Sequence, residues 1–399
     1  MALYVSDGNT LHKISNLVVG GATSGSDEGD GKYEVIVYDY DGTILKKQKL
    51  NTGDVFELPA LPTNHERLVA TGYCATTDIV DNKIVVKDSD VSVGVLYDTK
   101  SGFTEFDIVL TKASGLTFKL SGIAKTNGID WGDGVTDTAT SHTYAEYGKY
   151  TIMCDTTYLN TSSSSGIFGQ TSSSPNLTVT EMRMSSKVTG RILCNYCYAL
   201  ESVVVSPNTT NWVGNCFEYC VSLKHVTFVR NGSADLGSFC RNCYSLKSFV
   251  LGKGVTAGTG SDFLTYTPIR SFVFPDGFTT TNNGERYFNN CYLLERISMP
   301  DTVTVIGASM SYYSYNVRFI RVSKNITAIQ NGFLANAVQY TGTIDFSHFE
   351  KVPTLSTVYA FQYLNPQAKM VVPDALYDAW IAATNWSNFV GHIYKASEV

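Results

Sequence analysis

The sequence of 399 residues is poor in charge: charged residues make up 17% of it, and its net charge is −6. Lysine and arginine are scattered, so no basic block can neutralise a phosphate backbone, and we expect no nucleic-acid partner. No apolar run approaches the roughly 18 residues needed to cross a bilayer, so membrane insertion is not expected. The first residues lack the basic segment and apolar stretch of a signal peptide, which predicts synthesis in a cytoplasm.

The sequence also lacks the short motifs that mark many enzymes. Its six histidines are isolated and stand in no zinc-protease, nucleophile-elbow or cysteine–histidine pattern. No glycine-rich stretch ends in Gly-Lys-Ser or Gly-Lys-Thr, so a phosphate-cradling loop is missing. A catalytic pair of carboxylates is not excluded, because two such residues can meet in the fold without being close in the sequence. We therefore expect a protein that is not an enzyme and that uses no cofactor.

What the chain has instead is an internal repeat with the layout Phe-x-x-Cys-x-x-Leu-x-x-Val-x-Phe. The end of each copy alternates and predicts a short strand, whereas the preceding part predicts a helical turn. One such unit cannot bury its apolar side alone, so neighbouring units should stack around a shared core. The last apolar residue of the clearest copies falls at Val205, Phe228, Leu251, Phe274, Met299 and Val322. Weaker copies end at Met184, Phe346 and Val372.

The nine cysteines raise the alternative of a metal site. Residues 194–197 and 240–243 have the Cys-x-x-Cys spacing of zinc ligands. However, the cysteines share their repeat positions with Phe, Tyr and Ser, and a ligand site would not tolerate those replacements. A free buried cysteine behaves as a small hydrophobe. We therefore expect core packing, with no metal and no disulfide.

The repeat resembles the bacterial-surface-protein-A (BspA) type of leucine-rich repeat, and the segment from Phe288 to Pro300 matches that pattern best. The resemblance implies a leucine-rich-repeat solenoid over residues 177–372. It departs from the family pattern at Ser311–Val322, where small and polar residues replace Phe and Cys. Residues 373–399 begin with a proline followed by apolar residues at helical spacing, which predicts a helix that caps the solenoid.

Residues 33–98 form a separate segment with the pattern of a small β module. Two β runs meet at Asp41-Gly42, which is a strong hairpin signal. The order of the elements is similar to the internalin-type B repeat of bacterial surface proteins. Where that family usually has Gly-Trp, this chain has Gly72-Tyr73.

Residues 99–158 resemble a polycystic-kidney-disease (PKD) domain, which is a β-sandwich. The resemblance rests on Trp-Gly-Asp-Gly at Trp131, His-Thr-Tyr at His142 and Gly-x-Tyr-Thr at Gly148. Residues 159–176 are rich in Ser and Thr and predict a linker or an irregular start of the solenoid. The whole chain is therefore expected to be mainly β and built from several modules, with a repeat solenoid and a C-terminal capping helix.

The strand pattern also predicts where a ligand could bind. Residues between the buried positions of each strand should line an exposed sheet that is polar, with scattered apolar groups. A nearby group of tyrosines suits sugar rings or protein anchors; alternatively, some of these tyrosines replace the missing Phe and Cys in the core. The predicted ligand-binding residues are His225, Arg296, Tyr312, Tyr313, Tyr315, Phe319 and Arg321.

Two functions fit this layout of modules. The first is a bacteriophage virion protein of the tail (a tail fibre, tail tip or receptor-binding protein), which needs no signal peptide, no anchor and no oxidised cysteines. The opening MALYVSDGNTLHKI also has a short resemblance to the start of tail-associated proteins. Residues 1–32 would then attach to other tail proteins, and the repeats would bind a glycan or protein receptor on the bacterial host. The alternative is a bacterial cell-surface or secreted adhesin. Assembly into a homo-oligomer is left open.

Overall fold

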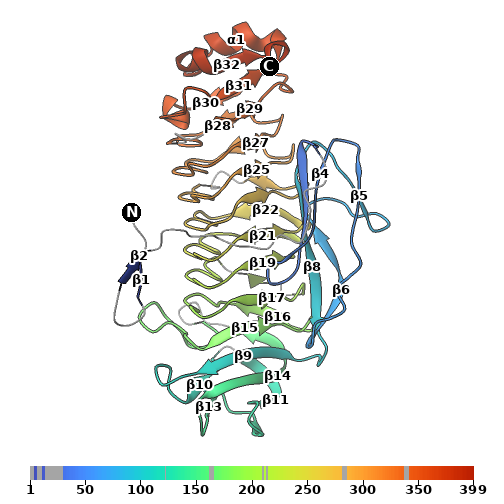
Figure 1. Ribbon diagram of the computed structural model, residues 1–399, viewed down its shortest axis with the longest axis vertical. Helices are drawn as coiled ribbons and strands as arrows, with labels where there is room; N and C mark the ends of the chain where they lie inside the picture. The colour runs from blue at the N-terminus through green and yellow to red at the C-terminus, as the bar shows by residue number, and fades with distance from the viewer. Residues whose placement is uncertain are drawn as a thin grey trace.

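The computed structural model describes residues 4–6, 11–13, 30–121, 123–160, 166–208, 211–212, 214–280, 285–336 and 341–399. The molecule is elongated, with a stack of coils along its long axis and a β module, residues 33–98, lying against the side of the stack (Figure 1). A single short α-helix of the described residues, α1 (Tyr377–Ala382), lies at the C-terminal end of the stack. The expected fold class, a mainly β chain with a repeat solenoid and a C-terminal helix, is confirmed.

The solenoid has a front sheet formed by one short parallel strand from each coil. Equivalent repeat positions pair in register, so that Ile297 lies beside Ile320 and Ile320 beside Ile344. The repeat spacing therefore translates directly into strand pairing. The front strands are β15 (Val179–Arg183), β17 (Ser202–Val204), β19 (His225–Phe228), β21 (Ser248–Leu251), β23 (Ser271–Val273), β25 (Arg296–Ser298), β27 (Phe319–Arg321), β29 (Thr343–Asp345), β31 (Lys369–Val372) and β32 (Ile393–Lys395).

A second set of strands forms another side of the coils. Like the front strands, which pair in the groups β15-β17, β19-β21 and β23-β25-β27-β29-β31-β32, it falls into three groups: β16-β18, β20-β22-β24 and β26-β28-β30. Its strands are β16 (Thr189–Ile192), β18 (Asn211–Trp212), β20 (Gly232–Asp235), β22 (Val255–Thr259), β24 (Thr279–Thr280), β26 (Val305–Ile306), β28 (Ala328–Ile329) and β30 (Thr354–Leu355).

The coils share one apolar core. The repeat leucines Leu223, Leu246 and Leu294 are fully buried, as the repeat predicts. A single cluster of buried side chains extends from Phe106 to Ile393. Each fully buried apolar side chain contributes about 1.5–3 kcal/mol relative to its exposed state, so the stack is held together along its whole length by this interior.

The cysteine position of the repeat has a second use besides packing. All nine cysteines are buried, and none of them forms a disulfide. The Cys291 thiol donates to the carbonyl oxygen of Leu264 in the preceding coil, at 3.1 Å. In the next coil the Ser314 hydroxyl makes the equivalent bond to the Phe288 carbonyl, at 2.7 Å. The position therefore needs a small side chain that can donate, which explains how serine replaces cysteine where the sequence departs from the pattern.

Residues 104–160 close the N-terminal end of the solenoid. Strand β9 (Thr104–Leu110) pairs with β15 of the first coil, so one sheet continues in the order β12-β11-β14-β9-β15-β17. The buried Trp131 anchors this end cap, and the Tyr144 hydroxyl donates to its carbonyl at 2.9 Å. The other strands are β10 (Thr117–Lys119), β11 (Ile123–Asp130), β12 (Thr136–Asp137), β13 (Ser141–Thr143) and β14 (Gly148–Asn160).

The β module has a four-stranded sheet in the order β4-β3-β8-β6 and a two-stranded sheet, β5-β7. A hairpin joins β3 to β4 around Asp41-Gly42, where Gly42 has a φ of 87°. The strands are β3 (Tyr33–Tyr38), β4 (Ile44–Leu50), β5 (Val55–Glu57), β6 (Leu68–Ala75), β7 (Lys83–Val85) and β8 (Val91–Thr99).

The C-terminal residues pack on the end of the solenoid, whereas only a small part of the first 32 residues is described. At the C-terminus, Trp380 and Trp386 are fully buried against the last coils. The short helices there are η1 (Val358–Phe361), η2 (Asp374–Leu376), η3 (Trp386–His392) and η4 (Ala396–Glu398). At the N-terminus, β1 (Tyr4–Ser6) and β2 (Leu11–Lys13) form a small hairpin. Apart from that hairpin and residues 30–32, the predicted attachment segment 1–32 lies outside the described residues.

Candidate ligand-binding site

The β module covers much of the front sheet of the solenoid. Strand β8 crosses β17, β19, β21 and β23. Gly94 of β8 lies so close to Thr227 that any side chain there would clash with the threonine side chain. Backbone hydrogen bonds fix the contact, since the amide of Asp276 donates to the carbonyl of Thr76 at 2.7 Å. The surface that the strand pattern predicts to be open is therefore largely an internal interface.

His225 lies in the middle of this interface and is fully buried. Its Nδ1 is 2.6 Å from Ser248 Oγ and its Nε2 is 2.8 Å from Thr227 Oγ1. Its ring packs on Tyr38 of the β module, with 5.4 Å between ring centroids. Burial lowers the pKa of His225 to about 3, so the ring is neutral. The prediction that His225 lies on an exposed sheet is wrong, because its outward side meets the module instead of solvent.

Arg296 also joins the two parts of the molecule. Its guanidinium makes two hydrogen bonds, of 2.9 and 2.8 Å, to the buried Asp90 carboxylate of the β module. The same guanidinium lies 4.0 Å from the ring centroid of Phe319, which in turn meets Tyr33 edge-on. Arg296 and Phe319 are only half-buried. Both side chains therefore contact the β module and are also partly exposed at the edge of the interface.

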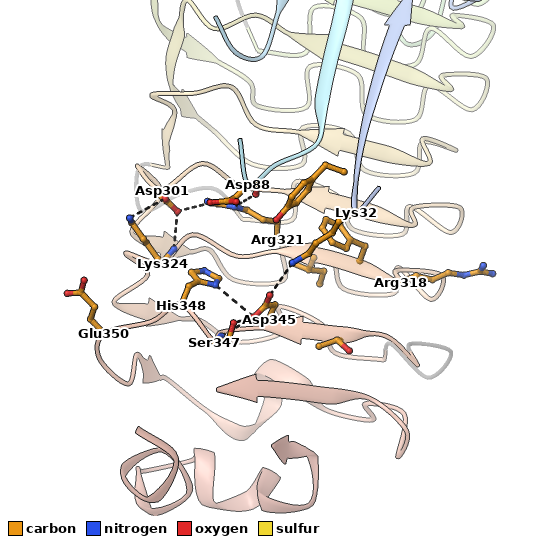
Figure 2. A pocket seen from close by; sticks show the side chains of 14 residues that line it. Lys32, Asp88, Asp301, Arg318, Arg321, Lys324, Asp345, Ser347, His348 and Glu350 are labelled. Carbon is orange, nitrogen blue, oxygen red and sulfur yellow. Dashed lines mark hydrogen bonds and ion pairs between the residues drawn. The ribbon is translucent and has the colours of Figure 1, made fainter. Parts of the chain in front are cut away.

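At that edge the β module ends and an open cleft begins (Figure 2). The cleft has a volume of about 720 Å³. Phe319 and Arg321, two of the predicted residues, lie in its wall, and Arg296 lies behind Phe319. Other polar groups that line it are Lys32, Asp88, Asp301, Lys324, Asp345, Ser347, His348 and Glu350.

Several charges of the cleft are arranged as ion pairs. Arg321 lies 2.7 Å from Asp301, and its Nε donates to the Asp88 carbonyl at 2.7 Å. Although burial acts to raise the pKa of Asp301, the Arg321 guanidinium outweighs it and lowers that pKa. Lys32 reaches across from the β module to Asp345, at 3.4 Å. Two carboxylates thus stay ionised in the cleft, each facing a cation.

Tyr312, Tyr313 and Tyr315 lie outside the cleft, in the turn that precedes β27. The ring centroids of Tyr312 and Tyr313 are 4.2 Å apart. All three tyrosines are half-buried, whereas Ser311 and Ser314 fill the inner positions of this coil. The alternative that these tyrosines replace the missing core residues is therefore wrong, and their role in binding stays a prediction.

Sequence reasoning missed most of the cleft, because its residues come from five separate segments of the chain. Lys32 and Asp88 belong to the ends of the β module, whose docking site has no sequence pattern. Asp345 could have been found, since the repeat register places it beside Arg321 in the neighbouring strand. Within the described part of the chain, no group of three His, Cys, Asp or Glu side chains could hold a metal ion.

Residues 170–286 and 237–341 match the family model of the BspA type leucine-rich repeat region, in six copies. Most of the solenoid is therefore similar to this repeat region. The match lies within the solenoid and its start, so the internalin-type and PKD resemblances of the upstream segments remain predictions. A comparison with curated proteins gives no match.

Two solved structures of leucine-rich repeat proteins are similar over about half of this chain. A leucine-rich repeat protein from Bacteroides ovatus ATCC 8483 is 14% identical over 50% of this chain and 51% of its own, with a TM-score of 0.34. A leucine rich cell surface protein from Faecalibacterium prausnitzii A2-165 is 18% identical over 53% of this chain and 70% of its own, with a TM-score of 0.25. The chain spans about half the length of the first.

Proposed function

We propose that this BspA-type repeat protein is a non-enzymatic recognition protein that acts at a bacterial surface as an adhesin and binds its receptor in the cleft. The observation that carries the proposal is the cleft itself, about 720 Å³ in volume and walled by both the β module and the solenoid. Its walls are fixed by the interface around Arg296 and Asp90, so the site is organised before a ligand arrives. Such preorganisation favours affinity, because fewer groups are ordered on binding.

The chemistry of the cleft favours binding over catalysis. A general acid or base works best when its pKa lies near the working pH. Here the pKa values of Asp301 and Asp345 are lowered, because hydrogen bonds and nearby cations outweigh the effect of burial. Both carboxylates therefore present fixed negative charge beside Arg321 and Lys32 and do not exchange protons near neutral pH. A partner with both hydrogen-bonding and charged groups, such as a surface glycan or protein, fits this lining.

The virion role suggested by the opening residues remains a weaker proposal. It requires attachment through residues 1–32, which lie largely outside the described residues. The BspA-type repeat supports the cell-surface role, which the sequence offered as the alternative. Among the described residues, none of the helices is long and apolar enough to span a membrane.

The test is binding of the fluorescently labelled full chain to intact bacterial and epithelial cells, measured by flow cytometry. The variant replaces Lys324 and Glu350, two exposed side chains on the rim of the cleft, with alanine. Arg321 is left intact, because its bonds to Asp88 and Asp301 also hold the fold. The control replaces the exposed Lys247, which lies three coils away on the solenoid.

We expect the rim variant to bind cells at least five-fold more weakly at an unchanged melting temperature, and the Lys247→Ala control to bind like the original chain. Equal binding by the rim variant would remove the cleft from recognition. Failure of the unaltered chain to bind any of the cells would contradict the adhesin role.

A further inference from the structure

One edge of the solenoid, the turn that precedes each front strand, repeats an unusual backbone conformation. At one position of the turn, six successive coils have a φ between 57° and 62°, a region that favours glycine and asparagine. Its amide donates to a carbonyl of the next coil, as Tyr219 does to Arg241 and Asn242 to Thr265, each at 2.9 Å. Successive turns are thereby held in register, about 4.8 Å apart. In six successive coils this residue is Tyr196, Tyr219, Asn242, Tyr266, Asn290 and Tyr313.

A second position, two residues further on, completes a row of tyrosines. It holds Tyr198, Tyr244, Tyr292 and Tyr315. Each of the six coils thus presents at least one tyrosine, and in the two coils where the first position is asparagine the second is tyrosine. We call the tyrosines at these two positions, from Tyr196 to Tyr315, the tyrosine edge.

Rings of neighbouring coils stack at both ends of the tyrosine edge. Tyr196 and Tyr219 stack with 5.2 Å between ring centroids and 14° between ring planes, and Tyr292 and Tyr315 stack at 6.0 Å and 17°. Tyr244 lies between these pairs; partial burial raises its pKa, and the neighbouring Tyr219 and Tyr266 rings add to the shift. The two stacked pairs, with Tyr244 and Tyr266 at the matching positions of the coils between them, follow one edge of the solenoid.

Three of the eight tyrosines of the edge are exposed, and the other five are half-buried. Tyr244 is 57% exposed, Tyr266 41% and Tyr292 47%. The hydroxyls of Tyr244 and Tyr292 donate to the side-chain oxygens of Asn242 and Asn290, at 3.2 and 3.0 Å. These bonds fix the ring orientation while the ring surface stays accessible.

Tyrosine at the first of these two positions strains the backbone. A bulky side chain at positive φ is an outlier, whereas asparagine tolerates that conformation. Asn242 and Asn290 show that the coil accepts asparagine there, yet tyrosine stands at this position in four of the six coils. A strained residue that recurs with its ring at the surface indicates a role other than folding.

The charged side chains beside the tyrosine edge indicate which class of ligand it can bind. Arg241 pairs with Glu218, and Arg286 lies 2.9 Å from Asp262, so the charged side chains that flank the turns neutralise one another. These paired charges offer a charged ligand no net electrostatic attraction, which favours an uncharged ligand that repeats along its own length. Repeated weak contacts along one ligand add up to avidity. Tyrosine combines an apolar ring with a polar tip, which suits a molecule with both kinds of surface.

We propose that the tyrosine edge binds an uncharged polysaccharide chain that lies along the solenoid axis. The apolar faces of its sugar rings pack on tyrosine rings of successive coils, and its hydroxyls exchange hydrogen bonds with the tyrosine hydroxyls and the asparagine amides. This site is separate from the cleft, so it stands whether or not the cleft binds a receptor.

The test uses the full chain on a printed array of neutral and acidic oligosaccharides of graded length. We expect binding to neutral glycans that strengthens with chain length and persists when salt is raised, since screening acts on charges. Replacement of Tyr244 and Tyr292 by alanine should weaken this binding at least ten-fold. The matched control is Tyr359→Ala, a tyrosine that is 54% exposed but lies outside the edge.

Three results would overturn the proposal: no neutral glycan bound by the unaltered chain, binding of acidic glycans only, or equal loss in the control and the edge variant. Tyr244→Phe with Tyr292→Phe keeps the rings and removes two hydroxyls. This variant should retain more binding than the alanine variant at the same melting temperature, which separates ring stacking from a folding defect.

Discussion

Acid should destabilise the contact between the β module and the solenoid, because it contains a buried neutral histidine. His225 lies between Tyr38 of the module and the hydroxyls of Ser248 and Thr227. The nearest charged group that acts on it is Asp41, whose favourable effect on protonation is smaller than the penalty of burial. The folded chain therefore keeps His225 neutral far below the pH at which an exposed histidine gains a proton.

The sign and size of the effect follow from the two pKa values. The pKa of His225 falls from 6.5 to about 3 on folding. Between those values the unfolded chain binds one proton more than the folded chain, so stability falls as pH falls. Above pH 6.5 His225 is neutral in both the folded and the unfolded chain, so this loss of stability is absent there. At pH 5, about 1.5 units lower, the loss is about 2 kcal/mol, since each unit corresponds to about 1.4 kcal/mol.

The assay is urea unfolding of the chain and of His225→Gln, each at pH 7 and pH 5. Glutamine keeps a donor and an acceptor for the two hydroxyls but does not titrate. The unaltered chain should lose about 2 kcal/mol more than the variant between the two pH values. An identical loss in both proteins would mean that His225 is accessible to protons in the folded state, and the buried interface would be refuted.

Three further substitutions test other parts of the structure by thermal and denaturant unfolding. Leu246→Ala removes a fully buried side chain from the shared core and should cost about 2–5 kcal/mol; a neutral effect would contradict stacked coils. Arg296→Ala leaves the buried Asp90 carboxylate without its partner and should cost about 3–5 kcal/mol, with a smaller loss when both residues are replaced; strict additivity would argue against the pair. Tyr363→Asn relieves a positive φ of 59° at an exposed side chain and should stabilise by about 1 kcal/mol; destabilisation would mean that the tyrosine packs on the fold.

The interior of the solenoid could be predicted from the sequence because the coil is a local unit. Positions such as Leu223, Leu246 and Leu294 recur at the same place in each repeat, and a core shared by stacked neighbours is the simplest way to bury them. The same regularity gives the strand register, including the placement of Arg321 beside Asp345.

The outside of the front sheet could not be predicted in the same way. Alternation in a strand shows which side chains point away from the core but not what they meet there. His225 and Ser248 look like solvent-facing residues in the sequence, yet they are buried beneath a module encoded some 150 residues earlier. The tyrosine edge could be predicted only in part, because Tyr313 and Tyr315 lie close together in the sequence while its other tyrosines are spread over five repeats.

Histidine modification by diethyl pyrocarbonate, read by mass spectrometry, tests most directly whether the β module covers the front sheet. In the folded chain at neutral pH, His225 should stay unmodified while the exposed His348 reacts. Gly94→Leu should make His225 reactive, because the new side chain clashes with Thr227 and displaces the module. Modification of His225 as fast as His348 in the unaltered chain would show that the front sheet is open, which contradicts both the buried interface and the cleft at its edge.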